Sequence, residues 1–280
     1  MYNRFMETTT LAILYSLVPL FGFGISNAMQ KTYAQRLGSA KLITYRGIAI
    51  SVMLFVILIL NLKNSTFDLK YLIIAIIIAA ISYFGLYFLN KGLEVGKVGL
   101  VVPLSSGRVL ITALVGALFL GERLGYVQLL FIILIFLGVV LSSINLTDLR
   151  NSQIFDIKSG IPYAILVAFF WGVTFPLFGI PVAILGVVFF SFILETTVTT
   201  TGIAQLIIQK KKISLTAQEF KDNYIGIGII AILGVLASIF MNLGYGTGHV
   251  SIVTAISAAS PVVSAIMGVI LYKESLNVQQ

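Results

Sequence analysis

Residues Gly96–Gln128 read GKVGLVVPLSSGRVLITALVGALFLGERLGYVQ, and residues Gly248–Gln280 read GHVSIVTAISAASPVVSAIMGVILYKESLNVQQ. The two stretches align without a gap at a constant offset of 152 residues, the difference between positions 248 and 96. Identical residues include the pairs Gly96 and Gly248, Val98 and Val250, Ser105 and Ser257, Ala113 and Ala265, Gly116 and Gly268, and Glu122 and Glu274. An internal repeat in such an apolar sequence predicts a membrane transporter built from two related halves.

The composition places most of this chain in lipid. The 280 residues are 59% hydrophobic and only 10% charged, with a mean hydropathy of +1.05. A water-soluble domain of this length could not bury so much apolar surface, so most of the protein must contact a bilayer. We therefore expect an all-α membrane protein, a polytopic helical bundle that crosses the plasma membrane of a bacterial cell several times.

Several classes of function are disfavoured by the residues that the sequence lacks. There is no cysteine, which excludes disulfides, thiolate metal sites and thiol nucleophiles, and there is a single histidine, His249. No phosphate-binding G-x-x-x-x-G-K-[ST] loop, zinc-binding helix motif or G-x-S-x-G elbow occurs. We expect no catalytic residue, metal or cofactor, and we expect the net charge of +8 to meet lipid headgroups rather than nucleic acid.

Nine segments are long and apolar enough to cross a bilayer, which needs about 20 residues per helix. They are residues 11–30, 40–61, 70–90, 97–119, 126–145, 160–178, 181–208, 223–245 and 250–272. The longest polar connection is 146–159, LTDLRNSQIFDIKS. We therefore divide the chain into a first repeat of five spans (1–145), a linker (146–159) and a second repeat of four spans (160–280).

The repeat predicts how the halves are related. An odd number of five spans per half would place the halves in opposite orientations, with a site near the midplane where they meet. If the second half matched the first, a tenth span would follow Gln280, so we expect the second half to lack its last helix here.

The basic residues fall unevenly on the two sides of the predicted membrane. The N-terminal side carries Arg4, Lys63, Lys70 and Arg123. The opposite side carries a larger set: Lys31, Arg36, Lys41, Lys91, Lys97, Arg150, Lys158, Lys210, Lys211, Lys212, Lys221 and Lys273. The positive-inside rule then places the N-terminus outside the cytoplasm.

A family resemblance is carried by residues Pro103–Leu141, PLSSGRVLITALVGALFLGERLGYVQLLFIILIFLGVVL. This stretch resembles the end of an EamA-type repeat in the drug/metabolite transporter superfamily, with a proline-containing helix, the turn Leu120–Gly121–Glu122 and an apolar span with a late glycine. Tyr45–Arg46 and Trp171–Gly172 resemble other positions of that family, and Pro261 and Lys273–Glu274 repeat the pattern.

The resemblance implies ten spans in two inverted repeats, and transport of a small metabolite or drug, commonly efflux driven by an ion gradient. The chain departs from the family pattern at three points. The tenth span is missing, Arg108–Val109 stands where the second repeat has Ser260–Pro261, and the charge count conflicts with the family's usual cytoplasmic N-terminus.

Glu195 is the most informative charged residue, because it lies near the middle of the predicted span 181–208. Glu195, Thr199, Gly202, Gln205 and Gln209 form one polar stripe on a helix. An ionised carboxylate facing lipid would be costly, so this stripe must face a cavity or another helix. It predicts a substrate or proton site; the alternative is a packing stripe in which Glu195 pairs with a basic residue.

Two arginines and an asparagine complete the predicted site. Arg108 lies midway along its span, and its permanently charged guanidinium needs an anion, either a substrate carboxylate or phosphate or Glu195 itself. Arg46 could contact a substrate or extend to the membrane interface. Asn242 belongs to a stripe with Gly234, Ser238 and Gly246 that is typical of close helix packing but also suits a ligand contact. The predicted substrate-binding residues are Glu195, Arg108, Arg46, Thr199 and Asn242.

These patterns favour a secondary transporter, not an enzyme, that moves a small metabolite such as an amino acid or related amphiphile by alternating access. We expect ion-coupled efflux, with protons or another ion as the partner, in a monomer or homodimer. A flippase for a lipid-linked sugar and an exporter of drug-like cations are alternatives within transport. A structural membrane subunit is the alternative from another class.

Overall fold

The computed structural model describes residues 2–119, 157–247 and 250–274, together with residues 121, 125, 126, 129, 130, 133, 134, 137 and 138. Every regular element in these residues is helical. Eight helical segments are long and apolar enough to cross a membrane: Thr9–Leu37, Ser39–Leu60, Leu69–Val95, Val98–Phe119, Ile161–Leu185, Val187–Ile208, Ala217–Gly246 and Ile252–Tyr272. The predicted all-α polytopic fold is thus confirmed. The predicted span 126–145 and the linker 146–159 lie largely outside the described residues.

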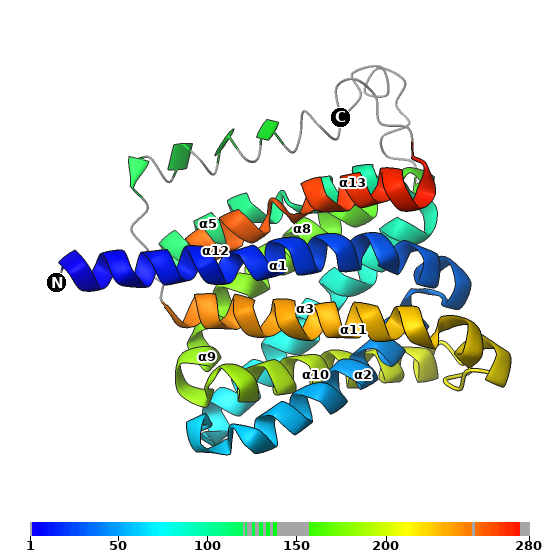
Figure 1. Ribbon diagram of the computed structural model, residues 1–280, viewed down its shortest axis with the longest axis horizontal. Helices are drawn as coiled ribbons and strands as arrows, with labels where there is room; N and C mark the ends of the chain where they lie inside the picture. The colour runs from blue at the N-terminus through cyan, green and yellow to red at the C-terminus, as the bar shows by residue number, and fades with distance from the viewer. Residues whose placement is uncertain are drawn as a thin grey trace.

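The long helices lie side by side in the bundle, as Figure 1 shows. The first half contains α1 (Tyr2–Leu37), α2 (Ser39–Leu60), the short η1 (Leu62–Asn64), α3 (Leu69–Val95), α4 (Val98–Ser105) and α5 (Arg108–Phe119). The second half contains the short η3 (Ile157–Ser159), α8 (Ile161–Leu177), α9 (Gly179–Leu185), α10 (Val187–Ile208), α11 (Ala217–Gly246), α12 (Val250–Ser257) and α13 (Ser260–Tyr272).

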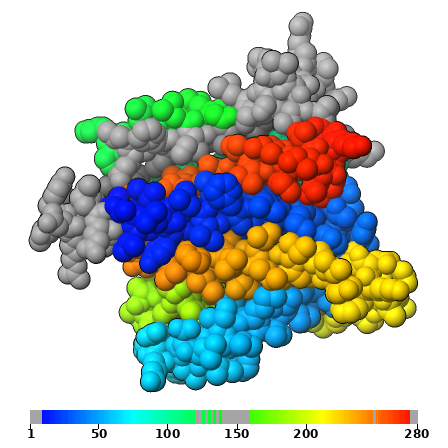
Figure 2. Space-filling model, in the orientation of Figure 1, coloured from blue at the N-terminus to red at the C-terminus, as the bar shows by residue number. Residues whose placement is uncertain are grey.

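Each long helix has one buried face and one exposed face that is also apolar. On α2, Ile50 and Leu54 are fully buried, whereas Val52, Phe55 and Val56 are more than half or half exposed. These residues alternate with the three- and four-residue spacing of a helix, so one side packs on protein and the other is suited to lipid chains. The main packing partners are α1 with α11, α2 with α10, and α3 with α8. Figure 2 shows α1 on one face of the bundle, between α12–α13 and α11.

Two glycines form the junctions before α2, which carries Arg46, and before α10, which carries Glu195. Gly38 joins α1 to α2 with φ 82° and ψ 150°, and Gly186 joins α9 to α10 with φ 85° and ψ 154°. Glycine adopts positive φ without the steric penalty of a Cβ, so the chain reverses at these positions. The predicted boundary between spans 160–178 and 181–208 is therefore wrong. The first of them continues through α9, where Pro181 fits the first helical turn, and ends at Gly186.

Both copies of the sequence repeat contain the same interruption in mid-span. The helix α4 ends at Ser105 and α5 begins at Arg108; α12 ends at Ser257 and α13 begins at Ser260. Each pair of boundaries is separated by the same 152 residues as the sequence repeat. Backbone bonds to the third preceding carbonyl, such as Val109 N to Ser106 O at 3.0 Å, bridge the first interruption. Interrupted helices near mid-membrane are typical of the substrate sites of transporters.

The two copies run in opposite directions along the bundle. At the start of α4, the amide of Val98 donates to Glu274, which follows α13, over 3.1 Å. At the start of α12, Val250 instead lies against Gly179, the first residue of α9. The last residue of α9, Leu185, accepts a hydrogen bond from the amide of Thr66, which follows α2. Equivalent residues of the repeats thus lie at opposite ends. Glu122, the counterpart of Glu274, lies outside the described residues.

Candidate functional site

A cavity of about 90 Å³ lies inside the bundle, between helices of both halves. Its wall comes from α1, α2, α3, α5, α8, α10 and α11, with Phe178 between α8 and α9. Aromatic side chains form part of the wall: Phe23, Trp171, Phe175 and Phe178. The polar lining residues are Ser26, Asn27, Gln30, Arg46, Ser82, Arg108, Glu195, Ser238 and Asn242. Convergence of a few polar groups in an otherwise apolar cavity is typical of small-molecule sites.

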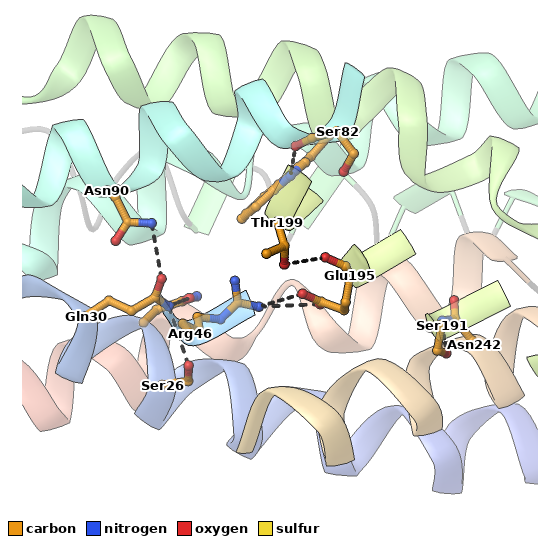
Figure 3. Close-up of polar contacts among 11 residues, drawn as sticks. Ser26, Gln30, Arg46, Ser82, Asn90, Ser191, Glu195, Thr199 and Asn242 are labelled. Carbon is orange, nitrogen blue, oxygen red and sulfur yellow. Dashed lines mark hydrogen bonds and ion pairs between the residues drawn. The ribbon is translucent and has the colours of Figure 1, made fainter. Parts of the chain in front are cut away.

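Arg46 and Glu195 form a buried ion pair in the wall of this cavity. Arg46 Nη2 lies 3.4 Å from both Oε1 and Oε2 of Glu195, and the residues are 5% and 7% exposed (Figure 3). Arg46 follows the first residue of α2 by seven positions, and Glu195 follows the first residue of α10 by eight. Extension of Arg46 to the membrane interface is therefore not observed, because its side chain points inward to the carboxylate on the neighbouring helix.

Arg108 occupies the same cavity in a different way. It is the first residue of α5 and is 5% exposed. Its Cζ atom lies 5.6 Å from the ring centroid of Trp171 and 5.5 Å from that of Phe175. Among the described residues no carboxylate pairs with Arg108, and its buried Nε has no hydrogen-bond partner. Of the anion partners predicted for Arg108, Glu195 is thus already held by Arg46.

Close backbone contacts hold the aromatic residues beneath Arg108. Trp171 Nε1 donates to the carbonyl of Ser82 on α3 over 3.2 Å, and the indole lies directly against Gly85. A Cβ atom on Gly85 would lie 2.3 Å from Trp171 Cδ1, so any other residue at this position would clash with the indole ring. On the other side, a Cβ on Gly172 would lie 3.2 Å from the carbonyl oxygen of Arg108. Stacked aromatic rings favour a guanidinium through the cation–π attraction.

A chain of amides runs from the cavity wall on α1 to α3. Gln30 Nε2 donates to Asn27 Oδ1 over 3.1 Å and lies 3.4 Å from Ser26 Oγ, and Asn90 on α3 donates to Gln30 Oε1 over 3.1 Å (Figure 3). Asn90, the last residue of the predicted span 70–90, was missed, although an amide in so apolar a segment is itself a signal for a polar partner on another helix.

Asn242 and Thr199 differ in their relation to the cavity. Asn242 lines it and donates to Ser191 Oγ over 2.8 Å. Thr199 is not among the lining residues; its Oγ1 donates to the backbone carbonyl of Glu195 over 2.7 Å. A Cβ on Gly47 would lie 2.1 Å from Thr199 Oγ1, so Thr199 packs α10 against α2. Four of the five predicted site residues therefore meet at one cavity.

The described residues contain no group of three or more His, Asp or Glu side chains placed to hold a metal ion. The polar groups of the cavity are instead two guanidiniums, one carboxylate, amides and hydroxyls. This set can bind an organic molecule through charge and hydrogen bonds, with apolar parts of the molecule against the aromatic wall.

Comparison with known proteins agrees with this architecture. The sequence profile described as the EamA-like transporter family matches residues 10–144 and again residues 158–280. The chain is also similar to an uncharacterized protein of Methanocaldococcus jannaschii, with 39% identity over 97 residues. Those residues are 34% of this chain and 71% of that protein.

Proposed function

The chain belongs to the EamA-like transporter family, and we propose that it is a secondary transporter of a small anionic or zwitterionic metabolite, such as an amino acid or a related amphiphile. Transport would proceed by alternating access of the central cavity to the two sides of a cell membrane. The observation that carries this proposal is Arg108, a buried guanidinium that lines the cavity without an acidic partner among the described residues.

The charges of the cavity favour an anionic group on the substrate. Arg46 and Glu195 neutralise each other, which leaves Arg108 as the uncompensated charge of the described lining residues. A buried arginine is stabilised strongly by a carboxylate that can accept two parallel hydrogen bonds. A drug-like cation would need an unpaired carboxylate, whereas the one carboxylate in this lining is held by Arg46.

The size of the cavity supports a cycle of opening and closing. Its volume of about 90 Å³ is well below the roughly 300 Å³ at which ligand pockets of proteins usually begin. Binding of an amphiphile therefore requires the helices around the cavity to separate. The inverted halves and the interrupted spans α4–α5 and α12–α13 provide the elements that such rocking motions use.

The coupling ion would act at the Arg46–Glu195 pair. A proton on Glu195, or a cation beside it, would weaken the attraction between α2 and α10 and leave Arg46 free to meet the substrate. We propose efflux coupled to such an ion. The alternative of a structural subunit predicts that none of these charges matters for solute movement.

Solute movement in proteoliposomes tests the proposal. The probes are leucine, phenylalanine and hexanoate, and each is compared with its primary amide. The amide has nearly the same shape as the acid but lacks the carboxylate. We expect flux of at least one acid above its amide, and loss of that flux in Arg108→Gln. Arg36→Gln, an exposed arginine outside the cavity, is the matched control. Equal flux in wild type and Arg108→Gln would reject the proposed role of Arg108.

A further inference from the structure

A second cavity lies at the end of the bundle where α1 ends and α2 begins. Its volume is about 200 Å³, and it shares no lining residue with the central cavity. The lining comes from the ends of α1, α3 and α10 and the start of α2, and it includes the side chains of Lys41, Lys91, Lys211 and Lys212. We call this cavity the lysine pocket.

Two of these lysines are compensated and two are not. Lys41 Nζ lies 3.1 Å from Glu219 Oε1, and Lys91 pairs with Glu94. Lys211 and Lys212 are exposed and have no ion pair with any described residue. The lysine pocket therefore carries an excess of positive charge.

The start of α2 adds hydrogen-bond donors to this charge. Its N-cap residue is Gly38, which has no side chain to accept from the first-turn amides. Glu94 Oε1 accepts from the Ser39 amide over 2.8 Å, but the amides of Ala40 and Lys41 have no partner among the described residues. Free amides at the start of a helix, together with the helix dipole, favour an anion.

The Ser39 hydroxyl provides an independent sign of a missing ligand. Ser39 lines the lysine pocket and is 1% exposed, and its Oγ atom is buried without a hydrogen-bond partner. An unsatisfied buried hydroxyl costs free energy, and such groups are rare in native structures. A phosphate oxygen in the pocket would supply the acceptor that this hydroxyl lacks.

We propose that the lysine pocket binds the phosphate group of an anionic phospholipid. The pocket lies where the membrane-spanning helices end, which is the level of the headgroups. Basic pockets between helix ends are known to hold such headgroups, and the positive-inside rule assigns this end to the leaflet rich in anionic lipid. Leu37 and Leu206 line the same pocket and offer apolar surface beside the phosphate.

Occupancy of the lysine pocket would connect the start of α2 to the end of α10. These are the two helices that carry Arg46 and Glu195, so the lipid would join them at the membrane surface as the ion pair joins them in the interior. This site is independent of the transported solute, and its test does not depend on transport.

The direct test measures lipid retention by native mass spectrometry and thermal unfolding of the detergent-purified protein. Phosphatidylglycerol is the anionic probe, phosphatidylcholine the zwitterionic one, and inorganic phosphate the source without acyl chains. We expect phosphatidylglycerol to bind and to raise the unfolding temperature more than either of the others. The double variant Lys211→Gln/Lys212→Gln should bind it about 25-fold more weakly at low salt, roughly five-fold for each lysine.

The matched control removes the same charge at the other end of the bundle. Lys63 and Lys70 are exposed and have no ion pair with a described residue, so Lys63→Gln/Lys70→Gln should retain phosphatidylglycerol as the wild type does. Equal losses in the two double variants would reject the lysine pocket, because they would reflect only net charge. A stabilisation by inorganic phosphate as large as that by phosphatidylglycerol would reject the lipid as the ligand and identify a soluble phosphate compound.

Ser39→Ala distinguishes a ligand contact from a structural role. Removal of an unsatisfied buried hydroxyl should leave the lipid-free protein as stable as the wild type or more so, while it weakens phosphatidylglycerol binding about tenfold. The substitution should therefore lower the affinity for phosphatidylglycerol without lowering the stability of the lipid-free protein. If Ser39→Ala lowered the stability of the lipid-free protein and left lipid binding unchanged, the hydroxyl would be structural and the proposed contact would be wrong.

Discussion

Arg46 Nη2 lies equally far, 3.4 Å, from the two carboxylate oxygens of Glu195, and this pair joins α2 to α10 in the wall of the central cavity. The two helices are counterparts in the halves: each has 22 residues and each follows a glycine with positive φ. The pair therefore lies where the halves meet, and the charges that satisfy each other come from different repeats.

Removal of one member of this pair should be more harmful than removal of both. Either Arg46→Gln or Glu195→Gln leaves a buried charge without a partner and should lower the free energy of unfolding by about 3 kcal/mol. The double variant should recover part of that loss. Unfolding in detergent measures the coupling energy, and the cycle of Arg108→Gln with Glu195→Gln is the control. A larger coupling energy in the Arg108 cycle would contradict the ion pair described here.

Glu274 should make the stability of the protein depend on pH. Burial raises the pKa of its carboxyl, but hydrogen bonds from Lys31 and from the amides of Val98 and Gly99 outweigh burial and hold this pKa below its ordinary value. A carboxyl whose pKa is depressed by folding stabilises the folded state above its unfolded pKa and loses that contribution as the pH falls through the folded pKa.

We therefore expect stability to decrease as the pH is lowered from about 5, and Glu274→Gln to remove part of this decrease. At neutral pH the same change should cost about 1–3 kcal/mol, as for hydrogen bonds to a charged group. Unfolding measured between about pH 7 and pH 3 tests this. Asp222→Asn, at an exposed carboxylate, should leave the dependence of stability on pH unchanged. An equal effect of the two substitutions would contradict the proposed contribution of Glu274.

Gly85→Ala should displace the indole beneath Arg108. The new methyl group would lie 2.3 Å from Trp171 Cδ1, so the ring must move, at a cost of about 1–3 kcal/mol. Trp171 is the single tryptophan of the chain, so a shift of its fluorescence reports the displacement directly. Gly228→Ala on α11 is the control, because a Cβ there meets no atom within 4 Å. It should be neutral or stabilising by up to about 1 kcal/mol.

Thr199 should affect stability rather than solute binding. In Gly47→Ala the new methyl group meets Thr199 Oγ1 at 2.1 Å, so this variant should be destabilised. Thr199→Ala in the same chain should restore part of the loss, since the next atom, Cβ, lies 3.2 Å away. Thr199→Ala alone should leave solute flux within about twofold of the wild type, a factor worth about 0.4 kcal/mol. A greater loss of flux without a loss of stability would make Thr199 a substrate contact after all.

The sequence predicted the helical fold because lipid leaves few alternatives: long apolar segments must form helices there. It also predicted four residues of the cavity, since charged and amide groups within apolar spans are costly and must converge. It did not predict the partner of Glu195. Spacing along one helix fixes a face but not which of two arginines on other helices lies opposite. Arg108 lies midway along its predicted span, as Glu195 does, whereas Arg46 lies nearer to the start of the span 40–61. The junction at Gly186 was missed, because the predicted spans 160–178 and 181–208 place the boundary before Pro181 and the helix continues to Leu185.

The interrupted spans are alike in length and position, but they begin their second parts with different residues, Arg108 in α5 and Ser260 in α13. If the two halves were identical, a bound molecule would meet the same charged group in each half and could bind in either of two opposite orientations. Among the described residues that line the cavity, the uncompensated guanidinium comes from one half alone. If the protein transports the substrate proposed above, a molecule with one acidic group would bind in one orientation only, with that group at Arg108.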